Sequence, residues 1–168
     1  CSKFIAIFII FGAFLERTGI ADFFIKISNS IVGGFSGGPA KVAVVASAFE
    51  GMVSGSSVAN TVGSGSVTIP LMKKTGYKPE FAAAAEASAS TGGQIMPPIM
   101  GAAAFLMAEN IGVSYSSMEL RAILPAALYF LGVFITVHLE AKKEGLRGLT
   151  KEELPRFLPL LKQSYLLL

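Results

Sequence analysis

Long apolar runs alternate with short polar or glycine-rich segments along this chain of 168 residues. The first run, residues 4–15 (FIAIFIIFGAFL), is uninterrupted and, with further residues upstream, is long enough to cross a bilayer as a helix. The next segment has helical periodicity, with Ile20, Phe23, Phe24, Ile27 and Ile31 apart from polar Asp22, Lys26 and Asn29. Residues 1–35 therefore predict the end of a membrane helix followed by an amphipathic helix at the membrane interface.

Residues 36–78 predict a re-entrant helical hairpin. Pro39 suits the first turn of a helix, and the apolar residues 42–53 make an arm of about 18 Å, which ends near or just past the middle of a bilayer about 30 Å thick. The serine and glycine residues 54–57 break the helix, and residues 58–72 lead back. Lysines flank both ends, Lys41 on one side and Lys73, Lys74 and Lys78 on the other, which favours a return to the same face of the membrane.

Residues 79–140 predict a broken transmembrane helix and a complete one. A small-residue helix over residues 80–91 ends at Gly92-Gly93, and Pro97-Pro98 opens a second apolar stretch that reaches residue 108. Residues 122–139 cross the membrane again, and residues 141–168 predict a cytoplasmic loop and the start of a further transmembrane helix. Because the chain begins without methionine inside an apolar run and stops at SYLLL, we expect a piece of a longer protein.

Composition agrees with an all-α membrane protein, a helical bundle with a re-entrant hairpin and a discontinuous transmembrane helix. Hydrophobic residues make up 52% of the chain and charged residues 15%. On the predicted path, 12 of the 14 basic residues share one side, which should be cytoplasmic, and only Lys3 and Arg121 lie on the other. The net charge of +3 therefore reflects topology, and no basic face interleaved with aromatic residues suggests nucleic acid.

The two interruptions are the candidate functional sites. Backbone that leaves helical geometry inside a membrane exposes peptide groups, which persist there when they line a wet cavity or hold an ion. The helix ends near Val53 and Thr91 offer carbonyl groups to a cation, and the helix starts near Ser57 and Pro97 offer N–H groups to a carboxylate. We expect Na⁺ as the coupling ion, no other metal and no organic cofactor. The expected ion ligands are Ser54, Gly55, Ser56, Ser57, Thr91, Gly92, Gly93 and Pro97.

Two carboxylates, Glu50 and Glu86, lie inside apolar segments and are candidates for coupling to a proton or cation. The alternative is a neutral or locally hydrogen-bonded acid between helices. An intramembrane serine hydrolase is a remote alternative, with His138 as the base for Ser54, Ser56 or Ser57, as is an ion channel or a purely structural bundle. Small residues that merely pack helices closely are the simpler explanation for Gly63 and Gly65.

The motifs FGAFLERTG, SGSSVAN, IPLMKKTGY and ASTGGQIMPPIMGAAAFLMAE, in this order and spacing, resemble the large membrane subunit of tripartite ATP-independent periplasmic (TRAP) transporters. The similarity covers nearly the whole chain and is to the fused-permease branch served by TAXI-type binding proteins. The resemblance implies one inverted repeat of an elevator-type, Na⁺-driven transporter for organic acids. A hairpin-type Na⁺/anion symporter that needs no binding protein is the rival within transport.

The resemblance also implies site residues and partners. The hairpin tip of the family falls on residues 54–57 with Asn60, and its unwound loop on residues 91–94 with Pro97, so Ser57, Asn60 and Gln94 are expected at the substrate. Expected partners are the lipid bilayer, an extracytoplasmic TAXI-type binding protein, the other half of the permease, and a small membrane subunit or its fused equivalent. We expect a multi-pass protein of the bacterial or archaeal cytoplasmic membrane.

Overall fold

The computed structural model describes residues 19–149 together with Ile7, Ile10 and Phe14. Every regular element in this described part is a helix: α2 (Ile20–Val32), α3 (Gly38–Ser54), α4 (Ser57–Gly63), α5 (Gly65–Lys74), α6 (Pro79–Gly92), the 3₁₀ turn η1 (Gly93–Ile95), α7 (Ala102–Ile111) and α8 (Tyr115–Lys143). The predicted all-α class is confirmed. The membrane helix predicted at residues 4–15 and the helix start predicted near residue 168 lie outside the described residues, apart from the three positions named.

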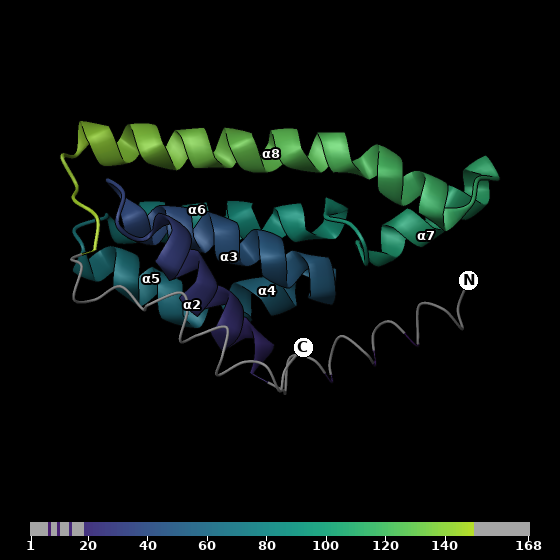
Figure 1. Cartoon of the computed structure of the whole chain (residues 1–168), viewed down its shortest axis with the longest axis horizontal. Helices are drawn as coiled ribbons and strands as arrows, with labels where there is room; N and C mark the ends of the chain where they lie inside the picture. The colour runs from purple at the N-terminus through teal and green to yellow at the C-terminus, as the bar shows by residue number, and fades with distance from the viewer. Residues whose placement is uncertain (1–6, 8–9, 11–13, 15–18, 150–168) are drawn as a thin grey trace.

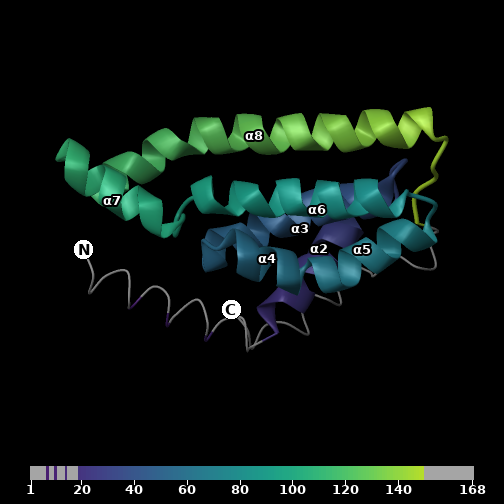
Figure 2. The same cartoon turned by 180° about the vertical axis from the view of Figure 1, so that it is seen from behind.

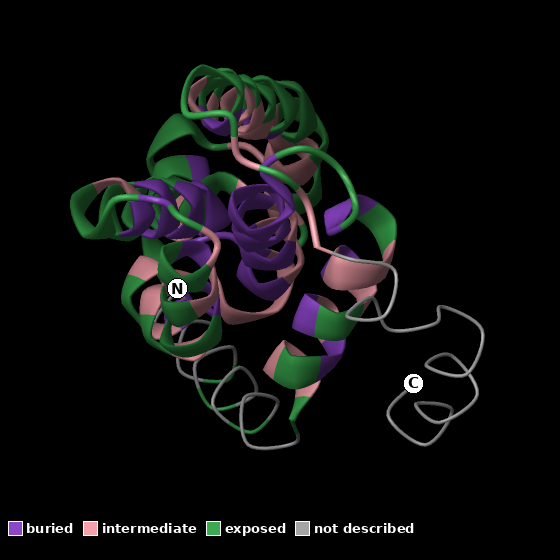
Figure 3. Ribbon diagram, turned by 90° about the vertical axis from the view of Figure 1, so that its left-hand side faces the viewer, coloured by how far each residue is buried: buried purple, intermediate pink, exposed green. Residues whose placement is uncertain are grey.

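The helices α3 and α6 form the centre of the bundle. In Figures 1 and 2, α8 runs along one side of this pair, while α2, α4 and α5 lie on the other. Figure 3 shows the buried positions gathered on the inner helices, whereas the surface of α8 is largely exposed. Small side chains dominate the contact, with Ala40, Ala43, Ala82 and Ala89 each 0% exposed, so the helix axes approach closely.

The segment from α3 to α5 is a helical hairpin. Its two ends lie together, because the Tyr77 hydroxyl, just after α5, donates a hydrogen bond of 3.2 Å to the carbonyl oxygen of Gly37, just before α3. Pro39 lies in the first turn of α3, as predicted. The first arm has 17 residues, or about 25 Å, instead of the expected twelve, because the helix already begins at Gly38. The depth of this hairpin in a membrane stays a prediction.

The returning arm is divided at Ser64 into α4 and α5. The backbone of Ser64 keeps helical angles (φ −67°, ψ −39°), and its N–H donates to the Asn60 carbonyl oxygen at 3.0 Å. The two short helices therefore form one nearly continuous arm. Pro70 stands inside α5, where its missing N–H removes one helical hydrogen bond.

The predicted broken helix is present, but its second half begins later than expected. The first half, α6, ends at Gly92 and is followed by η1 and an irregular segment, Met96 to Gly101, before α7 starts at Ala102. The prediction that Pro97 starts the second half is wrong. A residue that precedes proline is disfavoured in helical geometry, so Pro98 keeps Pro97 out of a helix, and Met100 has a positive φ of 52°.

The last helix, α8, has 29 residues and is the one helix in the described part that is long and apolar enough to cross a membrane. It runs back past α7 and α6 (Figure 1). Gly92, at the end of α6, packs against the rings of Tyr129 and Phe130, which lie in the middle of the apolar residues 122–139. The break in the preceding helix therefore begins level with the middle of this apolar stretch.

The predicted amphipathic helix is α2, and it packs against α3, while its place at the membrane interface stays a prediction. Its buried side chains are Phe23, Ile25, Ser28 and Val32, whereas Ile31 is 50% exposed. Ile25 and Val32 pack with Val42 and Ala46 of α3. Ser28 is 0% exposed and, being small, allows the two helices to approach; hydrophobic periodicity alone gave no weight to this serine.

Candidate ion and substrate site

The hairpin tip consists of two residues that leave helical geometry, Gly55 and Ser56. Gly55 adopts the left-handed conformation (φ 58°), which glycine reaches without steric cost, and ends α3. Ser56 is extended, and its side chain accepts a hydrogen bond of 3.3 Å from the N–H of Ala59, which caps α4. The interruption predicted over residues 54–57 is therefore confirmed but is shorter, since Ser54 and Ser57 belong to the flanking helices.

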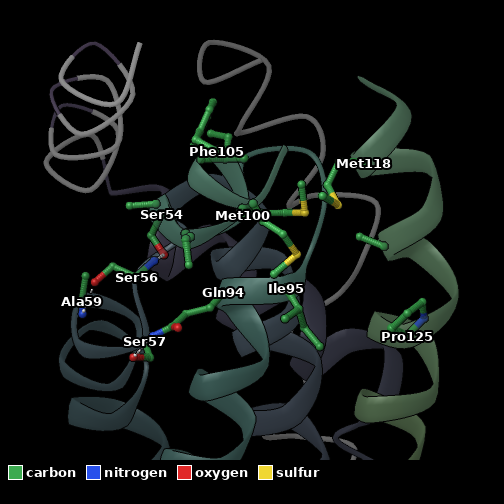
Figure 4. Close-up of a pocket in the computed structure, with 18 of the residues that line it drawn as sticks. Ser54, Ser56, Ser57, Ala59, Gln94, Ile95, Met100, Phe105, Met118 and Pro125 are labelled. Atoms are coloured by element: carbon green, nitrogen blue, oxygen red, sulfur yellow. Dashed lines mark hydrogen bonds between the residues drawn. The ribbon is translucent and has the colours of Figure 1, made fainter. Parts of the chain in front are cut away.

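The tip contacts the irregular segment between α6 and α7. A side chain on Gly55 would overlap the carbonyl oxygen of Met100, so the two backbones touch there. The Gln94 side-chain amide donates a hydrogen bond of 2.7 Å to the Ser57 hydroxyl (Figure 4). Within the segment, the Gly101 N–H donates to the Gln94 carbonyl oxygen at 2.7 Å, which folds the segment back toward η1.

Glycines allow this contact one turn below the tip as well. A Cβ on Gly93 would lie 2.9 Å from the Cα of Gly51, closer than real Cβ atoms approach, and 3.0 Å from the side-chain nitrogen of Asn60. The Tyr115 hydroxyl, at the start of α8, donates to the carbonyl oxygens of Ile99 and, at 3.2 Å, of Pro98, and so ties the irregular segment to α8. The two interruptions thus meet, as the sequence predicts.

A cavity of about 850 Å³ opens beside this junction. Its walls come from the hairpin tip, from Gln94 and Ile95, from residues 99–105 and Met107, and from the first turns of α8 (Figure 4). Most of the lining is apolar, and Arg121 is the one charged side chain among the described residues that line it. A mostly apolar cavity with a few convergent polar groups and one guanidinium suits a small organic anion.

The predicted site residues divide into two groups. Ser54, Gly55, Ser56, Ser57 and Gln94 line the cavity. The other predicted residues do not line it. The Thr91 hydroxyl donates to the Ala87 carbonyl oxygen of its own helix, Gly92 and Gly93 are buried between helices, and Pro97 is partly buried. Asn60 is 0% exposed, and its side-chain amide donates to the Ser47 carbonyl oxygen at 2.9 Å. Their roles in ion or substrate binding stay predictions.

Glu86 is 0% exposed and is surrounded by hydroxyl groups. Four hydroxyls lie within hydrogen-bonding distance of its carboxyl group: Ser64 at 2.5 Å, Ser47 and Ser90 at 3.3 Å each, and Thr68. They come from both arms of the hairpin and from α6 itself. The carboxyl group therefore lies at the junction of the hairpin with α6, below the tip.

Glu50 is also buried, at 3% exposure, and its carboxyl group faces Gly63 on the returning arm, where a side chain would overlap it. Glycine at position 63 thus makes room for this acid, beyond the general helix packing expected from the sequence. Both intramembrane acids are placed between helices, and neither lines the cavity.

Sequence reasoning missed the hydroxyls around Glu86, the contact of Met100 with the tip, and the place of Arg121 in the cavity. A signal for the first was present, since Asn60, Ser64 and Thr68 are spaced four apart, as are Glu86 and Ser90, which puts each set on one helix face. Arg121 was counted only for topology. The contacts of Met100 depend on the irregular backbone, which no spacing rule describes.

These features define an α-helical membrane protein built around a helical hairpin and a broken helix. Residues 2–168 match the family model described as the tripartite ATP-independent periplasmic transporter, DctM component, and the chain belongs to this family. It is part of a transport protein, and the serine hydrolase alternative is wrong. His138 lies near Lys41 and Lys142, whereas the three serines lie beside the first turns of α8.

Curated relatives of this chain include permeases for different substrates. It is 34% identical over 142 residues to the C4-dicarboxylate TRAP transporter large permease protein DctM of Vibrio cholerae, which covers 84% of the chain and 31% of that protein. It is 28% identical over 144 residues (86% of the chain, 22% of the relative) to the isethionate TRAP transporter permease protein DctMQ of Oleidesulfovibrio alaskensis. It is 24% identical over 159 residues (95% and 37%) to the sialic acid TRAP transporter large permease protein SiaM of Vibrio cholerae. The chain thus spans about a third of such relatives or less.

Proposed function

We propose that the whole protein is the large membrane subunit of a Na⁺-coupled secondary transporter that imports organic acids across a bacterial or archaeal cytoplasmic membrane. In this proposal the chain supplies one inverted repeat of an elevator-type permease. The observation that carries it is the contact of two helix interruptions, Gly55 with Met100 and Ser57 with Gln94, beside a cavity. Family membership supports the tripartite system over a symporter that works without a binding protein.

The junction offers the ligands that Na⁺ prefers. The side chains of Ser54, Ser56 and Ser57 and the backbone carbonyl of Met100 bring neutral oxygen atoms to one place at the ends of short helices. Hard cations bind oxygen, and neutral ligands hold a monovalent ion weakly enough to release it during transport. Thr91, Gly92, Gly93 and Pro97 are proposed as further ligands from the broken helix, and of these Gly93 packs against Gly51 of α3.

The substrate is proposed to be a small organic acid. Arg121 projects a permanent positive charge onto the cavity, and Gln94 and Ser57 offer hydrogen-bonding groups nearby. The names of three relatives refer to C4-dicarboxylate, isethionate and sialic acid, all of them anionic at neutral pH, which supports an organic acid as substrate without choosing among them.

The proposed partners follow from the tripartite family. They are an extracytoplasmic binding protein of the TAXI type that delivers the substrate, the second half of the permease, and a small membrane subunit or its fused equivalent. The name DctMQ of one relative is in keeping with a fused arrangement.

The test is a sodium titration of uptake by the full-length transporter with its binding protein in proteoliposomes. A panel of organic acids first identifies a transported one. Ser57→Ala removes one neutral oxygen at the junction and should raise the Na⁺ concentration for half-maximal uptake about tenfold, the effect of losing roughly 1.4 kcal/mol of interaction.

Ser66→Ala is the matched control, because this exposed serine stands on the same returning arm away from the tip. It should leave the sodium titration unchanged. Identical sodium curves for wild type and Ser57→Ala would refute the sodium site, and uptake that needs no binding protein would refute the tripartite mechanism.

A further inference from the structure

The cage of hydroxyls around Glu86 is separate from the cavity and from the tip. Its members are Ser47 on α3, Ser64 between α4 and α5, Thr68 on α5, and Ser90 on α6. All four hydroxyl residues and Glu86 itself are 0% exposed. The cage therefore joins both arms of the hairpin to the broken helix and is closed to solvent in this conformation.

No basic side chain among the described residues contacts this carboxyl group, and its hydrogen-bond partners there are the four hydroxyls. An ionised carboxylate buried without a counter-charge is costly, and the cost is removed when the group binds a cation. The Ser64 hydroxyl lies 2.5 Å from one carboxyl oxygen, and the Thr68 hydroxyl contacts the other directly. These are hydrogen-bond spacings, which leave no gap for a metal ion between the oxygens.

The hydrogen atoms of the cage suit a neutral acid as well as a carboxylate. Ser64 also contacts the Asn60 carbonyl oxygen at 2.8 Å, and Thr68 the Ser64 carbonyl oxygen at 3.0 Å. A hydroxyl has one hydrogen and can accept through its lone pairs. With that hydrogen on the carbonyl, Thr68 accepts the O–H of a protonated Glu86; with the hydrogen turned to the carboxyl group, it stabilises the ionised form. Rotation of the Ser64 and Thr68 hydroxyls thus allows the cage to form hydrogen bonds with either protonation state of Glu86.

We propose that Glu86 is a proton-binding site and that its protonation stabilises the packing of the hairpin against α6. The packed arrangement, in which the cage is closed to solvent, favours the neutral acid. Loss of the proton favours separation of the hairpin from α6, because separation lets water reach the carboxylate. The cage is linked to the junction of the two interruptions through Asn60, which contacts Ser64 and stands against Gly93. The role of this proton in transport rests on the proposed function, whereas proton binding itself does not.

Other ionisable groups on the elements packed against Glu86 lie in different surroundings. On α3, the Lys41 ammonium group stands between the rings of Phe35 and Phe134, and Glu50 faces Gly63. On α5, Lys73 and Lys74 are exposed at its end, and α4 and η1 carry no ionisable side chain. Tyr77 donates to the Gly37 carbonyl oxygen, and Glu80 is exposed in the first turn of α6. On α8, Tyr129 donates to the Ser88 carbonyl oxygen, Arg121 lines the cavity, and His138 lies near Lys41. Glu140 pairs with Lys143, and the other ionisable residues of α8 lie near its ends: Tyr115, Glu119 and Lys142.

The experiment is infrared difference spectroscopy of the full-length protein in liposomes during a pH titration, without substrate. A protonated carboxyl group absorbs at a frequency distinct from a carboxylate, so wild type should show a carboxyl band that disappears as the pH rises. Glu86→Gln should lack this band. Glu109→Gln, which changes an exposed acid at the end of α7, should retain it and is the matched control.

A second variant keeps the acid and changes its cage. Thr68→Val preserves shape but removes one hydroxyl and should move the titration midpoint of the band by about one pH unit, the equivalent of one hydrogen bond. An unchanged band in Glu86→Gln, an unchanged midpoint in Thr68→Val, loss of the band in Glu50→Gln instead, or a band removed by Na⁺ at constant pH would each overturn the proposal. Because no substrate is involved, these failures leave the sodium titration of uptake as an independent test of the proposed function.

Discussion

At the scale of single residues, the contact between the hairpin and the broken helix depends on Gly51 and Gly93. Gly51→Ala places a methyl group into the backbone of Gly93, which cannot yield as a flexible side chain would. Overpacking of this kind typically lowers the free energy of unfolding by about 1–3 kcal/mol, a cost that a glycine with open space beside it does not carry. We expect a lower melting temperature for the full-length protein and a loss of uptake.

Gly132→Ala is the control for this substitution, because no atom lies within 4 Å of a Cβ at that helical position. It should leave stability equal or slightly higher, since alanine is the better helix former. Thermal unfolding followed by the fluorescence of a thiol-reactive dye measures both variants, and equal losses in the two would contradict a specific contact at Gly51.

The conformation and burial of single residues could be predicted from the sequence only where they depend on neighbouring residues in the same segment. The turn at Gly55 follows from glycine and serine between apolar runs, and the buried acids follow from their apolar surroundings. The partners of Glu86 do not, because three of the four hydroxyls come from the hairpin, 18 to 39 positions away in the sequence. Which hydroxyl meets the acid depends on how the hairpin packs on α6.

At the scale of elements, the hairpin tip is held by the irregular segment from Met96 to Gly101. Gly55→Ala tests this connection, because its new methyl group would overlap the Met100 carbonyl oxygen in addition to straining a residue at φ 58°. Gly112→Ala imposes a similar backbone strain of about 1–2 kcal/mol at φ 73° but meets no atom within 4 Å.

We therefore expect Gly55→Ala to reduce uptake strongly and Gly112→Ala to reduce it little, at equal amounts of protein in the membrane. The initial rate of uptake per inserted protein is the measurement. Similar rates for the two variants would mean that backbone strain alone, rather than contact with the irregular segment, accounts for the effect.

Elements with a clear start signal were predicted well, and elements that depend on packing were not. Pro39 lies in the first turn of α3 and α6 ends at its glycines, as these local signals predict, although α3 as a whole is longer than its apolar run. The start of α7 was placed at Pro97 because a single proline favours a first turn, but the second proline excludes helical geometry at the first. The sequence made no prediction of the face by which α2 packs on α3, because a serine, not a large apolar residue, fits there.

At the scale of the whole molecule, the described helices have a base and a far end. The base joins the start of α3, the turn between α5 and α6, and the end of α8, through Tyr77 with Gly37, Lys78 with Glu144 at 3.8 Å, and the Ser36 hydroxyl, which donates to the Leu146 carbonyl oxygen. The far end carries the loop between α7 and α8. This arrangement agrees with the segregation of basic residues that predicts a cytoplasmic base.

Single cysteines in an otherwise cysteine-free full-length protein test this topology. Lys74→Cys and Arg147→Cys are exposed positions at the base, and Ser116→Cys is an exposed position in the first turn of α8 at the far end. A membrane-impermeant maleimide applied to inverted membrane vesicles should label both base positions and leave position 116 unlabelled, while intact spheroplasts should give the opposite pattern. On the predicted path, the broken helix and α8 each cross the membrane between positions 74 and 147, so these two positions share a side. The hairpin itself is tested by Ser36→Cys, an exposed position just before α3, which should be labelled from the same side as position 74. If the segment from α3 to α5 instead crossed the membrane once, positions 36 and 74 would be labelled from opposite sides, which would contradict a hairpin whose two arms return to the same face.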